Sequence, residues 1–141
     1  SDAPLREAER ALDAGELVAL MPQGTIPRGP AFFEPVLVGR GGAARLAAAT
    51  GAPVIPIALW GTELVWPRSS RLPNLVNVTS PPTVRTRVGP AVSGLTGRSV
   101  PADTKRIMAA IMGLLPAESK ARRQPSPEEL ARTYPSGHQP D

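Results

Sequence analysis

The segments Leu17-Val18-Ala19-Leu20-Met21 and Val54-Ile55-Pro56-Ile57-Ala58-Leu59 are apolar, rich in branched side chains and closed off by Pro or Gly. Short runs of this kind are typical of strands buried on both faces of a sheet. Between them lie a loop rich in Pro and Gly, residues 22–39, and a predicted helix over Gly41–Thr50. Strand, loop, helix and strand make a βαβ unit. We therefore expect an α/β fold with a mixed, largely parallel sheet and flanking helices.

The loop after the first predicted strand is the place where a ligand is expected. Ligands of βαβ units gather at the carboxyl ends of the strands, where loops and helix N-termini present free backbone N–H groups. This rule places Gln23–Arg28 and Trp60–Glu63 on one rim. Arg40 comes just before the predicted helix, whose positive dipole end attracts anions. The sequence thus predicts an anion site near the start of that helix.

Three blocks of the sequence occur in this order: Met21-Pro22-Gln23-Gly24-Thr25, then Arg40-Gly41-Gly42-Ala43-Ala44-Arg45-Leu46-Ala47, then Val54-Ile55-Pro56-Ile57-Ala58. In composition and spacing they resemble blocks of the glycerolipid acyltransferases, the lysophosphatidic acid acyltransferase family. The matching family blocks are a Phe-Pro-Glu-Gly-Thr-Arg segment, a basic helix start rich in Gly and Ala, and a Val-Pro-Val strand. The resemblance runs from about Leu5 to about Leu115.

This resemblance implies acyl transfer from acyl-CoA or acyl-carrier protein to the hydroxyl of a lysophospholipid or glycerol phosphate, with no bound cofactor. It also implies a cytoplasmic protein at the inner face of the membrane. The implied acceptor-binding residues are Gln23, Gly24, Thr25, Arg28 and Arg40. The sequence departs from the family block in having Gln23 in place of Glu and Ile26 in place of Arg. We expect Arg28 to supply the cation that Ile26 cannot, and to be the principal phosphate ligand.

The family's catalytic motif, a His and an Asp separated by four residues, is expected upstream, and this chain has no His before His138. We therefore expect no catalytic residue here. The chain is expected to be the carboxyl-terminal half of the enzyme, which supplies acceptor binding and is inactive alone. A non-catalytic lipid-binding, CoA-binding or interaction domain is the alternative. The coding sequence before Ser1 would separate the two readings.

Composition excludes several other classes of function. The 141 residues carry a net charge of +4, and most of the 16 basic residues are Arg, which is compatible with phosphate-bearing partners. Aromatic residues are few, so a stacking platform for nucleic acid is not expected. The chain has no Cys and a single His, which argues against a metal site. No apolar run reaches the roughly 18–20 residues that a membrane span requires.

Two aromatic groups leave alternatives open. Phe32 and Phe33 fill a core gap under the 22–39 loop, or they line an apolar groove or touch the membrane. The segment that contains Trp66, Arg68 and Arg71 forms a lip facing lipid or phosphate, or its side chains anchor the loop.

The remaining segments have simpler signals. We expect helices over Leu5–Ala14 and Ala102–Leu115, and strands over Val76–Thr79 and Val84–Val88. From residue 117 onward Pro, Ser, Arg and Glu dominate. Ser126 and Pro127 signal a short helix that continues through Arg132. We expect residues 1–116 to form the acyltransferase-like part and residues 117–141 to be a mostly flexible tail.

Overall fold

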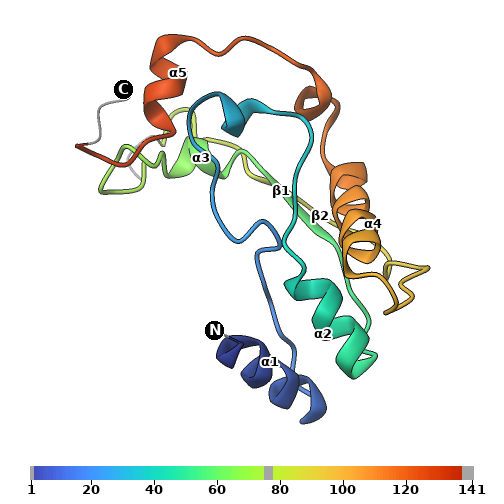
Figure 1. The fold of residues 1–141 in the computed structure, drawn as a ribbon. Helices are drawn as coiled ribbons and strands as arrows, with labels where there is room; N and C mark the ends of the chain where they lie inside the picture. Colours follow the sequence, from blue (N-terminus) through green and yellow to red (C-terminus); the bar gives the residue numbers. More distant parts are fainter. Residues whose placement is uncertain (1, 75–77, 138–141) are drawn as a thin grey trace. The chain divides into compact units, whose positions relative to one another are not determined.

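The computed structural model describes residues 2–74 and 78–137 and is built mainly from helices and loops (Figure 1). Its elements are α1 (Ala3–Asp13), η1 (Gly29–Phe33), α2 (Gly42–Thr50), β1 (Ile57–Trp60), α3 (Thr62–Val65), β2 (Arg85–Val88), α4 (Val100–Leu114), η2 (Ala117–Lys120) and α5 (Pro127–Arg132), where η marks a 3-10 helix.

Contacts divide the chain into two compact units. The first unit contains Ser1–Thr25, Leu37–Ile57 and Val88–Leu114, and the second contains Ile26–Val36, Ala58–Arg87 and Leu115–Asp141.

Helix α1 in the first unit begins two residues earlier and ends one residue earlier than the predicted Leu5–Ala14 helix. A Pro in its first turn has the φ angle that a helix start needs. At the other end Gly15 has a φ of 81°, which a side chain would disfavour. The Gly15 N–H donates to the Leu12 carbonyl and the Glu16 N–H to the Ala11 carbonyl, a Schellman motif that satisfies the last free carbonyls. The predicted helix over Leu5–Ala14 is therefore confirmed, and it contacts α2.

The core of the first unit lies between α2 and α4. Ala43, Ala44 and Ile107 are buried there, and Val54 and Leu95 are among the apolar side chains that pack around them. Small Ala side chains on α2 leave room for the larger side chains of α4, so that the two helices pack directly. The predicted helices over Gly41–Thr50 and Ala102–Leu115 are both confirmed.

The predicted largely parallel sheet is wrong. Strands β1 and β2 form a two-stranded sheet. Just before β1, Pro56 accepts a hydrogen bond from the Gly89 N–H, and Val54 accepts one from the Val92 N–H, both at 2.9 Å. The residue number rises from 89 to 92 on one side of the pair while it falls from 56 to 54 on the other, so the two strands are antiparallel. Strand β1 matches the second half of the predicted 54–59 strand, and β2 matches the predicted strand at 84–88.

The parallel arrangement fails because Leu17–Met21 is not a strand. A strand needs a neighbour to satisfy its backbone groups, and no strand among residues 2–74 and 78–137 pairs with this segment. Leu17 is 89% exposed, so the apolar run is not buried. The predicted strand at Val76–Thr79 falls partly on residues 76 and 77, which lie outside the described residues.

The second unit contains nearly all of the β1–β2 pair and the end of the chain. Arg85 of β2 forms an ion pair with Glu118 of η2 at 3.1 Å. The pKa of Glu118 is lowered by its own backbone N–H and then by the Arg85 guanidinium. The predicted helix at 127–132 is confirmed as α5, and it contacts η1. The predicted flexibility of residues 117–141 stays a prediction.

Candidate functional site

The loop that follows Met21 forms a tight turn in the first unit. The Gly24 N–H donates to the Met21 carbonyl at 3.0 Å, which closes the turn. The Arg40 N–H donates to the Pro22 carbonyl at 2.7 Å, so the turn is fixed to the backbone that leads into α2. Two of the three resembling blocks thus meet at one place.

Gly24 allows the Arg40 side chain to lie across this turn. Its φ is 67°, a conformation that glycine adopts without the strain other residues incur. A Cβ added to Gly24 would come within 2.7 Å of Arg40 Cδ and 2.9 Å of Arg40 Nε. The Arg40 stem therefore occupies the space that a side chain at position 24 would need. The structure brings these two predicted site residues together.

The start of α2 adds further donors beside Arg40. Gly41 is the N-cap residue and provides no side-chain hydrogen bond, so the first N–H groups of α2 are not capped by it. Arg45, one turn into the helix, reaches back until its Nε is 3.9 Å from the place where a Cβ on Gly41 would sit. Arg40 and Arg45 are both exposed, and within the described residues neither takes part in an ion pair. Their charge is available to an anion.

Thr104 of α4 lies below the same helix start. Its Oγ1 is 3.9 Å from the Cβ position of Gly41, and it is buried without a hydrogen-bond partner in the described part of the chain. The sequence signals no role for Thr104, because it stands far along the chain from the other site residues, near the start of an ordinary amphipathic helix. Only the packing of α4 against α2 places its hydroxyl here.

The other predicted site residues are less closely assembled. Gln23 and Thr25 lie in the same turn, Gln23 partly buried and Thr25 exposed. Arg28 belongs to the second unit, where it is exposed and precedes η1 in an extended conformation. The site described here therefore consists of first-unit residues, and Arg28 is not part of its geometry. His138 lies outside the described residues.

Residues 2–74 and 78–137 hold no cluster of His, Cys, Asp or Glu that could bind a metal ion. None of the helices in this part of the chain has the length and apolar character that a membrane span requires.

Comparison with known proteins identifies no relative: no protein-family model, no curated protein sequence and no solved structure matches this chain.

Proposed function

We propose that the chain binds the phosphate of a lysophospholipid or glycerol phosphate, as part of an enzyme that transfers an acyl group to the hydroxyl of that acceptor. The observation that carries the proposal is the Arg40 side chain, which lies across Gly24 at the start of α2. A guanidinium grips phosphate through two parallel hydrogen bonds. The first N–H groups of α2 can also donate hydrogen bonds to the phosphate, and the positive end of the helix dipole attracts its negative charge.

The reaction divides its tasks between acceptor binding and proton transfer. The acceptor hydroxyl attacks the thioester carbonyl of acyl-CoA or acyl-carrier protein, and the carbon–sulfur bond breaks. A base takes the hydroxyl proton and returns it to the departing thiolate. The resemblance assigns that base to an upstream His. The proposed task of this chain is to hold the phosphate and thereby orient the hydroxyl.

A non-catalytic lipid- or CoA-binding domain is the second candidate. The observation that favours it is the position of the chain's single His, His138, in the polar segment Ser-Gly-His-Gln-Pro. Both candidates use the same phosphate site, because lysophospholipids and CoA each carry phosphate. A His-x4-Asp motif encoded within about a hundred residues before Ser1 would favour the enzyme, and a start codon directly before Ser1 would favour the binding domain.

Calorimetric titration of the chain with glycerol 3-phosphate tests the phosphate site. We expect Arg40→Ala to weaken binding about tenfold or more, which corresponds to about 1.4 kcal/mol. Arg28→Ala, measured beside it, tests the ligand that the sequence predicts. Arg6→Ala is the matched control, because Arg6 is exposed on α1 and its removal changes the net charge equally.

The controls define what would refute the site. Glycerol lacks the phosphate and should not compete. Equal loss of affinity in Arg40→Ala and Arg6→Ala would mean that the affinity for glycerol 3-phosphate depends only on the net charge of the chain. Unchanged affinity in both Arg40→Ala and Arg28→Ala would contradict the proposed function.

Peripheral binding to the inner face of the membrane is the remaining part of the proposal. Its support is the loop that follows α3, where Trp66 is 56% and Leu72 is 76% exposed. Trp66 Nε1 donates to the Ser70 carbonyl and Ser70 Oγ to the Leu72 carbonyl, so backbone contacts order the loop while both apolar side chains stay exposed. Arg71 is exposed in the same loop. Exposed apolar side chains beside a cation suit an anionic lipid surface.

Sedimentation with vesicles tests this membrane contact. We expect the chain to bind vesicles that contain phosphatidylglycerol more strongly than pure phosphatidylcholine vesicles. Leu72→Ser should weaken binding at least about tenfold, since burial of a Leu side chain is worth about 1.5–3 kcal/mol. Leu17→Ser is the matched control, because Leu17 is also exposed but lies in the first unit. Equal loss of binding in both variants would refute a specific role for this loop.

A further inference from the structure

Within the second unit, Thr133 holds the backbone next to Arg28. The Gly29 N–H donates to Thr133 Oγ1 at 2.7 Å, and this bond is buried. Thr133 Oγ1 in turn donates to the Leu130 carbonyl at 2.7 Å, so its proton points into α5 and its lone pairs are free to accept from Gly29. Thr133 is only 4% exposed. The buried Thr133 hydroxyl therefore both accepts one hydrogen bond and donates another, and it fixes the Gly29 backbone to α5.

Gly29 is shaped to receive this contact. Its φ is 57°, and a Cβ at this position would come within 2.6 Å of Tyr134 Oη. Gly29 is buried, and because it has no side chain, Tyr134 can lie against its backbone. The tyrosine that follows Thr133 therefore closes over the same backbone.

Two side-chain contacts extend the fastening along the loop. The Arg123 guanidinium lies over the Phe33 ring with its Cζ 5.0 Å from the ring centroid, a cation–π contact. Arg122 forms an ion pair with Glu34 at 3.3 Å. Both are exposed enough that each contributes little alone. Together with Thr133 they align residues 122–134, here called the strap, with residues 26–34, here called the Arg28 loop.

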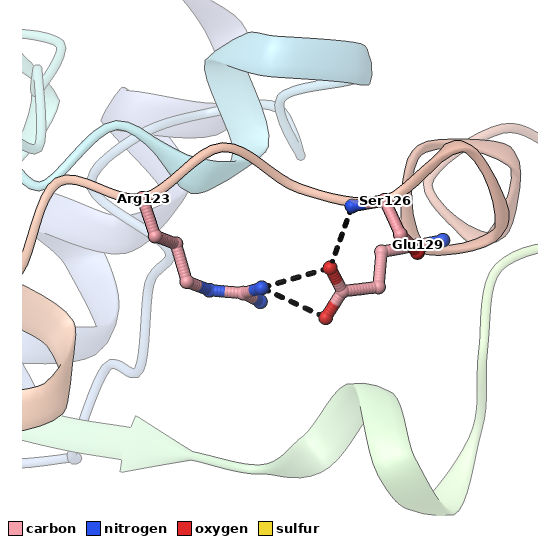
Figure 2. A network of polar contacts seen from close by, with 3 residues as sticks. All are labelled: Arg123, Ser126 and Glu129. Carbon is pink, nitrogen blue, oxygen red and sulfur yellow. Dashed lines mark hydrogen bonds and ion pairs between the residues drawn. The ribbon is translucent and has the colours of Figure 1, made fainter.

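The strap has a local structure that holds Arg123 and Thr133 in place. Figure 2 shows the Glu129 carboxylate between the Arg123 guanidinium and the Ser126 N–H. Both Glu129 oxygens accept from Arg123 Nη1 at 2.8 Å, and one accepts from the Ser126 N–H at 2.9 Å. Ser126 Oγ accepts from the Glu129 N–H, which completes a capping box at the start of α5.

We infer that the strap fixes the peptide bond between Arg28 and Gly29, with Thr133 as the positioning residue, and so sets the direction in which the Arg28 side chain leaves its loop. The Gly29 N–H that Thr133 accepts is part of that peptide bond. On the other side of Arg28, Pro27 restricts its own φ angle. The consequence for phosphate binding rests on the proposed function and on the sequence-based prediction that Arg28 is a phosphate ligand, while the fastening itself rests on neither.

Amide hydrogen exchange of Gly29 and phosphate affinity together test this inference. Thr133→Val removes the hydroxyl but keeps the shape, and Thr133→Ser keeps the hydroxyl. We expect the Gly29 amide to exchange slowly in the wild type and in Thr133→Ser, and at least tenfold faster in Thr133→Val. The affinity for glycerol 3-phosphate should fall several-fold in Thr133→Val and return in Thr133→Ser. In an Arg28→Ala background, Thr133→Val should have no further effect on affinity.

The outcomes separate the inference from the proposed function. Fast exchange of the Gly29 amide in the wild type, or equal exchange rates in Thr133→Val and Thr133→Ser, would overturn the inference that the strap fixes Gly29. This holds whatever the measured affinity for glycerol 3-phosphate. Lost protection in Thr133→Val with unchanged affinity, while Arg28→Ala weakens binding, would overturn the positioning role. If Arg28→Ala and Arg40→Ala both leave affinity unchanged, the proposed function fails and Gly29 exchange still decides on the fastening.

Deletion of residues 124–141 provides a second test that requires no ligand. The sequence-based prediction of a mostly flexible tail implies that this deletion leaves thermal stability nearly unchanged. If the strap fixes Gly29, the deletion should instead speed up hydrogen exchange of the Gly29 amide and lower the melting temperature by several degrees. Retention of slow Gly29 exchange after the deletion would overturn the inference.

Discussion

Replacement of Asp103 by Ala should destabilise the first unit more than most single substitutions. Asp103 lies in the first turn of α4 and is 2% exposed. Its carboxylate accepts the Thr96 N–H with Oδ1 at 3.1 Å and Oδ2 at 3.2 Å, and the Gly97 N–H with Oδ2 at 2.8 Å. These bonds hold the 93–99 loop against the helix. Gly97 in turn approaches Ala48 of α2, so the loop closes one side of the core.

The magnitude follows from the two backbone donors that would lose their partner. A hydrogen bond to a charged group contributes about 1.5–3 kcal/mol, so two such donors give roughly 3–6 kcal/mol. The negative charge near the N-terminus of α4 adds roughly 0.3–1 kcal/mol. Small domains have unfolding free energies of about 5–15 kcal/mol, so this loss is a large share. Asp103→Asn keeps one acceptor oxygen, and we expect it to lose about half as much.

Urea unfolding followed by circular dichroism at the helix band measures this loss. Asp13→Ala is the matched control, because Asp13 is exposed at the end of α1, where an acidic charge is not favoured by the helix dipole. Its unfolding free energy should change by less than about 0.5 kcal/mol. A loss below about 1 kcal/mol in Asp103→Ala would refute the reasoning, since two buried donors cannot lose a charged partner so cheaply.

Two further predictions concern the Arg40 site and the strap. Gly24→Ala should displace the Arg40 side chain and weaken glycerol 3-phosphate binding, measured by calorimetry. Gly51→Ala is the control, because Gly51 has a similar positive φ angle but open space around it, so this substitution should lower only the stability, by about 1–2 kcal/mol. Equal affinities of the two variants for glycerol 3-phosphate would refute the contact between Gly24 and Arg40. The pKa of Glu129 is lowered from its ordinary value of 4.5, first by the Arg123 guanidinium and then by a backbone N–H. Because the folded-state pKa is the lower one, these contacts stabilise α5 above pH 4.5 and are lost as the pH falls through the folded-state pKa. An NMR titration of the Glu129 carboxyl should therefore have its midpoint below 4.5, and a midpoint at or above that value would contradict the network.

The sequence by itself predicted helices α1, α2, α4 and α5, because their start and stop signals are local, but it did not predict α3, η1 or η2. Gly15 and Gly51 end α1 and α2 with the positive φ angles that glycine favours, and Ser126 begins α5 with a capping box. These signals act between residues a few positions apart, so they do not depend on the rest of the chain. The strand predicted at Val84–Val88 likewise corresponds to β2, Arg85–Val88.

Tertiary structure alone decided which apolar segments pair and which side chains meet. Leu17–Met21 has the composition of a buried strand, but composition cannot provide the neighbouring backbone that a strand needs, and the segment stays exposed. The contacts of Arg40 with Gly24 and of Thr133 with Gly29 join residues far apart in the chain. Such contacts depend on chain geometry accumulated over many residues, which no local pattern encodes.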